Sequence, residues 1–344
     1  MGKPRRLAVG QLGRGRRPVC VFISGRGAPT IRGIMILRLA LAILVLAVLL
    51  GLEIILGPGG FPGGSLLTLR LTRALLAVFV GASLSVSGAA LQSLFQNPLA
   101  DPYVLGTASG AALGYALGFF LGLGNPGVLS LPAAAGAVGS LFVVYALSSV
   151  RGRLSGTRML LAGVMVGFFA SGLVAILMIL AKAEAIRTFY VLWGNLGIVV
   201  TGGDIPHLIV LALVILAGMT ALFFTSRQLD ALSLGETEAL SLGVNVQALK
   251  AIVFITTGIM VGIATSVVGA VGFVGLVVPH MARRLLSPRH SVLLPGSAMG
   301  GAILVLASDL LLRLVGFYQL PVGVITSLVG VPFFLYILRT RAAS

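Results

Sequence analysis

Few side chains in this sequence could bind a nucleotide or carry out catalysis. The three lysines are Lys3, Lys182 and Lys250, and none of them both follows Gly and precedes Ser or Thr. The phosphate-binding loop of an ATPase needs a lysine in that setting. The chain has no HExxH motif, and its one cysteine, Cys20, excludes a disulfide framework. These residue types predict no catalytic site, no metal site and no ATP site on this chain.

A polar loop from Leu229 to Val244 is the most regular candidate for binding another protein. Its sequence, LDALSLGETEALSLGV, predicts two short helices separated at Gly235 and ended at Gly243, with acidic residues early in each. A mixed polar and apolar element of this kind suits docking into a groove of a partner. From composition alone, an ordinary interfacial helix is an equally good interpretation.

Two further groups of residues fall at helix ends. Asn97 and Asp101 precede prolines in QNPLADP, and such residues are first of all turn formers. Arg70 and Arg73, in RLTR, and Arg313 fall at predicted outer helix ends, where arginines usually contact lipid headgroups. The alternative is a basic rim that binds an acidic partner.

The composition places these residues in a membrane protein. Of the 344 residues, 58% are hydrophobic and 9% are charged, and the mean hydropathy is +1.11. Soluble domains are about 45–50% apolar and about 25% charged. The formal net charge of +16 fits the excess of basic residues in cytoplasmic loops, so we expect no nucleic-acid binding. The sequence predicts an all-α polytopic membrane protein.

Apolar stretches predict where the chain crosses the membrane. They cover residues 34–56, 74–95, 103–123, 128–150, 159–181, 205–225, 250–280, 292–312 and 321–338. A helix needs about 20 residues to cross the hydrocarbon core, so 250–280 is too long for one span. We expect a full helix there, a turn near Gly269–Gly272 and a short returning helix. This gives about ten transmembrane helices.

The basic residues support this count, with both termini in the cytoplasm. Five of them lie outside in such an arrangement, which leaves 19 of the 24 inside. The outer five are Arg70, Arg73, Lys182, Arg187 and Arg313. Residues 1–33 then form a basic, disordered cytoplasmic leader, and residues 34–340 form a single transmembrane domain.

The third predicted helix carries glycine at every fourth position. These residues are Gly106, Gly110, Gly114, Gly118 and Gly122. Glycines at this spacing share one helix face and allow a neighbouring backbone to approach closely. We expect the stripe to pack against another helix; lining a pore is the alternative.

Carboxylates that could couple transport to an ion gradient are scarce. The acids within predicted spans, Glu53 and Asp309, both fall near outer helix ends. An ion-coupled carrier usually has a carboxylate at the membrane midplane, although backbone carbonyls can also bind sodium. An ion-coupled secondary transporter or channel, working without an ATPase, is therefore the less favoured alternative. A membrane-embedded enzyme or structural protein is less favoured still.

Six ordered blocks resemble the FecCD-type permeases, the transmembrane subunits of ABC importers for iron-siderophores, haem and vitamin B12. The blocks are RLTR at 70–73, SGAALQSLFQNPLADPYVLGTASGAALG at 87–114, LLAGV at 160–164, SLGETEALSLGV at 233–244, GFVGLVVPHMARR at 272–284 and LPVGVITSLVGVPFFLYIL at 320–338. Their order and spacing cover most of the chain.

The resemblance implies a homodimer with the type II ABC importer fold, in the cytoplasmic (inner) membrane of a prokaryote. Membrane lipid surrounds the dimer, and the translocation path runs between the two copies. Two ATPase subunits dock on the cytoplasmic side and hold the ATP and Mg, while a substrate-binding protein docks outside. ATP hydrolysis drives alternating access for an iron-siderophore, haem or cobalamin. This chain itself has no cofactor and is not an enzyme.

The resemblance also implies roles for particular residues. Arg70, Arg73 and Arg313 match arginines that pair with glutamates of the binding protein. Asn97 and Leu99 match an inner gate, and Gly156 and Thr157 match a second gate layer. The loop 229–244 matches the coupling helices that receive the ATPase movement, with Leu229, Asp230, Leu234, Gly235, Glu236, Glu238, Ala239, Leu242 and Gly243 as the contributing residues.

Overall fold

Helices make up nearly all of the structure, a computed structural model that describes residues 28–57, 63–123, 126–150, 152–180, 193–197, 205–317 and 320–342. They are α1 (Ala28–Ile55), α2 (Ser65–Leu94), the 3₁₀ turn η1 (Pro102–Leu105), α3 (Thr107–Phe120), α4 (Pro126–Ser148), α5 (Gly156–Leu180), α7 (Ile205–Phe224), α8 (Ser226–Leu232), α9 (Glu236–Ser241), α10 (Val246–Val268), α11 (Val274–Leu285), α12 (His290–Val315) and α13 (Val322–Ala342). A two-residue hairpin, β1 (Ser149–Val150) and β2 (Arg153–Leu154), precedes α5. The predicted all-α fold class is confirmed.

Each of the ten predicted spans has a helix in the structure. Six of the described helices, α1, α2, α4, α5, α10 and α12, are long and apolar enough to cross a membrane alone. Helices α7 and α8 pass the same test as a pair that bends by 58°. The count of ten stays a prediction, because α3 and α11 have 14 and 12 residues and a span needs about 20.

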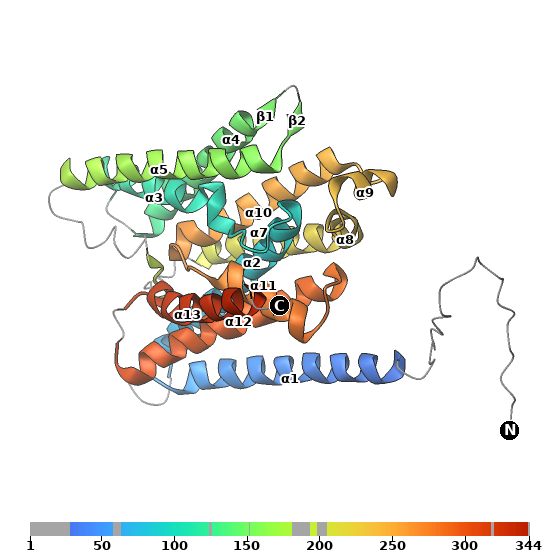
Figure 1. Cartoon of the computed structure of the whole chain (residues 1–344). Coiled ribbons are helices and arrows are strands. Elements are labelled where there is room, and N and C mark those ends of the chain that lie inside the picture. The colour runs from blue at the N-terminus through green and yellow to red at the C-terminus, as the bar shows by residue number, and fades with distance from the viewer. Residues whose placement is uncertain are drawn as a thin grey trace, which may run out of the picture.

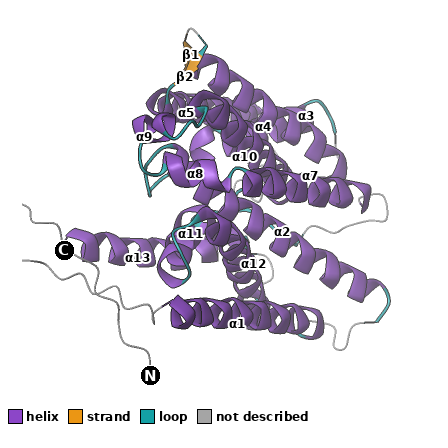
Figure 2. Cartoon of the chain, turned by 90° about the vertical axis from the view of Figure 1, so that its right-hand side faces the viewer, coloured by secondary structure: helices purple, strands orange, loops and turns teal. Residues whose placement is uncertain are grey.

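The long helices run roughly side by side (Figure 1). Helix α2 is the most buried of the candidate spans and packs against α10, α11 and α12. Helix α1 lies on one flank, against α12, and α3, α4 and α5 lie on the other. The start of α1, the β-hairpin, α8 and α9 gather toward one end of the bundle, which Figure 2 views directly.

The expected break within 250–280 is confirmed. Helix α10 ends at Val268, Gly269 follows with φ of 86°, and α11 starts after Phe273, whose φ is 66°. The Tyr103 hydroxyl accepts a hydrogen bond of 2.8 Å from the Val271 N–H in this turn. Irregular backbone inside a membrane protein needs such internal partners, and this turn has one.

Two predicted helix starts are wrong. Helix α2 begins at Ser65 rather than residue 74, because Arg70 and Arg73 lie in its first turns and have buried partners there. Helix α3 begins at Thr107 rather than residue 103, because the preceding residues form η1 and Gly106 has φ of 75°. Helix α1 begins at Ala28, inside the predicted leader, and residues 1–27 lie outside the described residues.

Of the five glycines in the stripe, Gly110, Gly114 and Gly118 pack against α4, as predicted for close helix packing. Gly106 precedes α3 and faces Gly163 of α5, whereas a Cβ added at Gly122 would have no atom within 4 Å. A Cβ added at Gly114 would lie 2.0 Å from the Pro132 carbonyl oxygen, and one at Gly110 would lie 2.5 Å from that of Gly136. Helix α2 makes an even closer contact, since a Cβ at Gly88 would lie 1.8 Å from the Gly275 oxygen of α11. The backbones can touch at these positions because glycine has no side chain.

We expect Gly88→Ala to lower the free energy of unfolding by about 1–3 kcal/mol, because the backbones of α2 and α11 must separate to admit the methyl group. The matched control is Gly139→Ala in α4, where an added Cβ has no atom within 4 Å. Thermal unfolding of both variants in detergent micelles measures the difference. Equal stability of the two variants would contradict the packing described here.

Candidate functional site

Two short helices project from one end of the bundle, as the sequence predicts. Helices α8 and α9 are separated at Gly235, whose φ is 139°, and α9 is followed by Gly243, whose φ is 79°. The predicted coupling residues divide between two environments. Leu229 and Ala239 are fully buried against the bundle, whereas Leu234 and Leu242 are 70% and 65% exposed. The remaining predicted coupling residues, Asp230, Gly235, Glu236, Glu238 and Gly243, are exposed or half-buried.

Helix α8 is attached to the bundle through a buried histidine. Asp230 Oδ1 accepts a hydrogen bond of 2.8 Å from the His290 N–H and lies 2.6 Å from His290 Nδ1. On the other side of the ring, Nε2 lies 2.7 Å from Ser93 Oγ in the last turn of α2. His290 is 2% exposed and is the first residue of α12, so Asp230 caps α12 from a different helix.

Helix α9 is attached separately, through a lysine of α10. Lys250 is 2% exposed; its Nζ lies 2.5 Å from Glu236 Oε1 and 3.4 Å from the Leu154 carbonyl oxygen. The Leu154 N–H in turn donates to Gln247 Oε1 over 2.8 Å. Neither this pair nor the one at His290 was predicted from the sequence, because spacing along the chain cannot identify partners in different helices.

The two predicted gate groups both lie beside the end of α2. Asn97 forms the expected turn, with its Oδ1 accepting from the Leu99 N–H over 2.9 Å. Gly156 faces the Phe95 ring, and a cavity of about 380 Å³ is lined by Gly156 and Thr157 together with residues of α2 and Lys250. The gating role of these residues stays a prediction.

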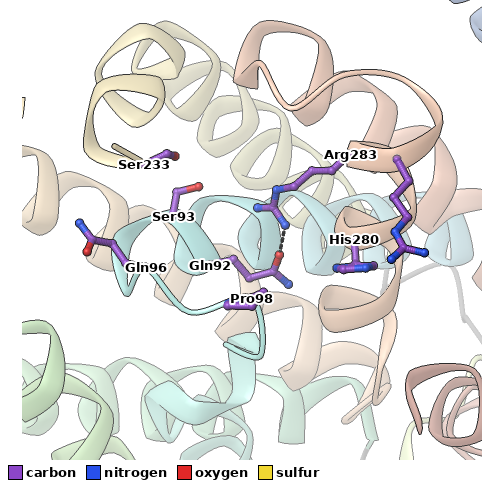
Figure 3. Close-up of a pocket in the computed structure, with 8 residues that line it drawn as sticks. Gln92, Ser93, Gln96, Pro98, Ser233, His280 and Arg283 are labelled. Atoms are coloured by element: carbon purple, nitrogen blue, oxygen red, sulfur yellow. Dashed lines mark hydrogen bonds between the residues drawn. The ribbon is translucent and has the colours of Figure 1, made fainter. Parts of the chain in front are cut away.

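A second, basic cavity borders the same loop (Figure 3). It measures about 400 Å³. Its lining residues are Gln92, Ser93, Gln96, Pro98, Ser233, His280, Arg283 and Arg284. Arg283 donates to the Gln92 side chain and, over 3.4 Å, to the Ala89 carbonyl oxygen. This cavity lies where α2, α8 and α11 meet.

At the opposite end of the bundle, the three predicted docking arginines lie together. Arg73 holds Asp309 through two hydrogen bonds, Nε to Oδ2 at 2.7 Å and Nη2 to Oδ1 at 2.6 Å. Arg313 pairs with Glu53 and lies 3.6 Å from Asp309. Arg70 donates to the last carbonyl oxygens of α1, those of Ile54 and Ile55, over 2.8 and 2.9 Å.

These contacts satisfy charges that would otherwise be costly to bury. Glu53 and Asp309 have no exposed surface, and Arg70 and Arg313 are 4% and 6% exposed. A buried charge in a membrane protein requires a partner of opposite charge. Of the three arginines, Arg73 is the most accessible, with 19% of its side chain exposed. The docking role therefore stays a prediction, and each arginine already has partners within this chain.

The acid partners could have been found from one signal in the sequence. Glu53 and Asp309 are the acids within predicted spans, and both were placed at the outer membrane level where the three arginines lie. Opposite charges confined to one level of a low-dielectric bundle favour pairing. Which acid pairs with which arginine depends on the packing of α1, α2 and α12.

We expect Asp309→Asn to lower the free energy of unfolding by about 3 kcal/mol, because it removes a fully buried carboxylate and leaves the half-buried Arg73 without its partner. The double variant Asp309→Asn/Arg73→Gln should lose less than the sum of the single variants. Thermal unfolding in detergent measures all three, with Glu238→Gln, an exposed carboxylate, as the control. Additive losses would show that the pair contributes nothing to stability.

Comparisons with known proteins agree with this architecture. The model of the FecCD transport family matches residues 34–340. The chain is 39% identical over 279 residues to the cobalamin import system permease protein BtuC of Halobacterium salinarum, covering 80% of this chain and 73% of that one. It is 40% identical over 285 residues to the hemin transport system permease protein HmuU of Yersinia pestis, covering 80% and 83%.

Solved structures have the same fold. One, described as a metal-chelate type ABC transporter in an inward-facing conformation, superposes with a TM-score of 0.78 at 28% identity, covering 90% of this chain and 99% of that one. PsaBC from Streptococcus pneumoniae, solved with a Fab, superposes with a TM-score of 0.53 at 19% identity, covering 78% and 90%. From its family match and its helices, this chain is a multi-pass membrane protein that belongs to the FecCD transport family.

Proposed function

We propose that this chain is the permease subunit of an ABC importer that moves a metal chelate into the cytoplasm by alternating access. The observation that carries the proposal is the pair α8–α9. Its outer surface exposes Leu234, Leu240 and Leu242, each by 60% or more, at one end of the bundle. Polar contacts hold both helices to the bundle, at the buried His290 for α8 and at the buried Lys250 for α9. An apolar surface on a firmly attached element suits a partner that pushes on it.

The proposed partner on this surface is an ATPase subunit, which binds the ATP and Mg. The lysine that the structure describes, Lys250, is 2% exposed and paired with Glu236, so it is not placed to hold a phosphate. The other lysines, Lys3 and Lys182, lie outside the described residues, and neither has a Walker A context. In this proposal the chain transmits the energy of hydrolysis and does not catalyse it.

The remaining parts of the complex follow from the same proposal. Two copies of the chain enclose the path within the lipid of a prokaryotic cytoplasmic membrane. Both termini lie in the cytoplasm with α8 and α9, and a binding protein docks at the opposite end, near Arg70, Arg73 and Arg313. The named relatives carry cobalamin and hemin, and both molecules are metal chelates. This supports a cargo in the class of iron-siderophores, haem and cobalamin.

The first test is association with an ATP-binding-cassette subunit encoded beside this chain. We expect a complex with two copies of each, whose affinity falls at least about thirtyfold in Leu234→Glu/Leu242→Glu, since a charge on a central apolar contact costs about 2 kcal/mol or more. The control is Leu314→Glu. Leu314 is 60% exposed and lies in the last turn of α12, at the end of the bundle opposite α8 and α9. Absence of any such complex would overturn the proposed function.

The second test concerns the outer arginines, and it separates docking from stability. Arg73→Gln and Asp309→Asn break the same internal ion pair, but only the first removes the positive charge. If the binding protein docks on this charge, Arg73→Gln should reduce its stimulation of ATPase activity severalfold, and Asp309→Asn should not. Equal stimulation in the two variants would exclude Arg73 from the docking surface.

A further inference from the structure

Helices α2 and α12 form a continuous pair that runs the length of the bundle. A Cβ added at Gly81 of α2 would lie 2.2 Å from the Gly301 carbonyl oxygen of α12, and one added at Gly301 would lie 2.1 Å from that of Gly81. Backbones in direct contact have no soft side-chain layer between them. Movement of one helix of this pair therefore moves the other.

Polar contacts join the pair at both ends. At one end Arg73 of α2 and Asp309 of α12 form the two-bond ion pair, with Asp309 fully buried. At the other end His290 of α12 contacts Ser93 of α2, and both residues are buried. The predicted docking arginines therefore lie at one end of the α2–α12 pair, and the contact with Asp230 of α8 lies at its other end.

The imidazole of His290 joins three helices at once. The Asp230 carboxylate can only accept a hydrogen bond, so His290 Nδ1 donates to it across the 2.6 Å contact. In the neutral ring, Nε2 then accepts from the Ser93 hydroxyl at 2.7 Å. The backbone N–H of the same residue donates to Asp230 as well. One side chain therefore links α8, α12 and the end of α2.

A second contact reinforces this link on the α2 side. Gln96, two residues past the end of α2, donates from Nε2 to the Leu232 carbonyl oxygen at the end of α8, over 3.2 Å. The residues that follow include Asn97 and Leu99, which match the predicted inner gate. A shift of α8 is therefore delivered to the start of the gate loop by two routes, through His290 and through Gln96.

The attachment of α9 differs in kind. Glu236, which holds Lys250, has 48% of its side chain exposed, and it ties α9 to α10 and the β-hairpin rather than to α2 or α12. The pair at His290 has similar burial, since His290 is 2% and Asp230 37% exposed. The two links differ in the elements they reach, because the contact at His290 ends on α2 and α12, which carry the gate loop and the outer arginines.

The order Asp230, His290, Ser93 also occurs in the catalytic triads of hydrolases, but its setting here is different. A nucleophilic serine stands at an exposed turn, whereas Ser93 lies within α2 and is 6% exposed. Its hydroxyl also lies 3.3 Å from the Ala89 carbonyl oxygen one turn earlier. These contacts hold the helices in register.

We propose that His290 is the positioning residue through which movement of α8 reaches the α2–α12 pair, and through that pair both the gate loop and the outer arginines. Such coupling is reciprocal, so docking at the outer end biases α8 through the same contacts. The proposal rests on the ATPase partner of the proposed function and adds the residues that carry the movement.

The test reads the gate directly and needs no cargo. Cys20, the single native cysteine, is replaced by serine, and Leu99→Cys supplies a reporter at the gate loop. In the complex with the ATPase subunit, the rate of labelling by fluorescein maleimide is compared without nucleotide and with ATP and vanadate. We expect the two rates to differ at least about fivefold, and this difference to fall by at least about half in Ser93→Ala and in His290→Asn, in which the contact through Gln96 remains.

Two control variants distinguish this link from general packing. Ser148→Ala removes a buried hydroxyl that donates to Val144 within α4, and Ser93→Thr retains the hydroxyl on α2. Both should keep the nucleotide-dependent difference. An undiminished difference in Ser93→Ala and His290→Asn would overturn the proposal, and so would its loss in Ser148→Ala. Co-elution of the ATPase subunit with each variant in gel filtration reports assembly, so failure of the ATPase to associate would instead count against the proposed function.

Discussion

Direct backbone contact between α2 and its neighbours is the constraint on which the rest of this structure depends. Gly81 lies against α12 and Gly88 against α11, at distances that no Cβ would permit. In lipid there is little hydrophobic drive to bring apolar helices together, so close packing of backbones supplies much of the association energy. Helix α2 consequently becomes the centre of the bundle, and the elements with proposed roles are arranged around its two ends.

The ion pairs among the described residues lie at those two ends. Within the described residues, the acids of the long helices, Glu53 and Asp309, both meet arginines at one end. At the other end Asp230 and Glu236 of the short helices meet His290 and Lys250. Between them the described helices are joined mostly by apolar and backbone contacts, with hydrogen bonds between the side chains of Ser85, Gln92 and Tyr103 and the backbone near the turn between α10 and α11.

Much of the fold was predictable from local patterns. Hydropathy located a helix for every predicted span, and the glycines of α3 predicted its packing face. The length of the apolar stretch 250–280, together with the positions of the basic residues, predicted the break at Gly269. The start of α2 was misplaced because hydropathy scores Arg70 and Arg73 as solvent-exposed, whereas in the structure each has partners within the bundle. Hydropathy patterns therefore misplace helix ends wherever charged residues have partners inside the protein.

By itself the sequence determined the membrane class, the helices, the two short helices α8 and α9 and the resemblance to a permease family, because hydropathy, turn residues and ordered motifs are properties of neighbouring residues. Only the tertiary structure decided which groups meet. Arg73 and Asp309 are 236 positions apart and Asp230 and His290 are 60 apart, and their pairing follows from the packing of α2, α8 and α12. Burial makes such pairs energetically important, and no spacing along the chain reveals them.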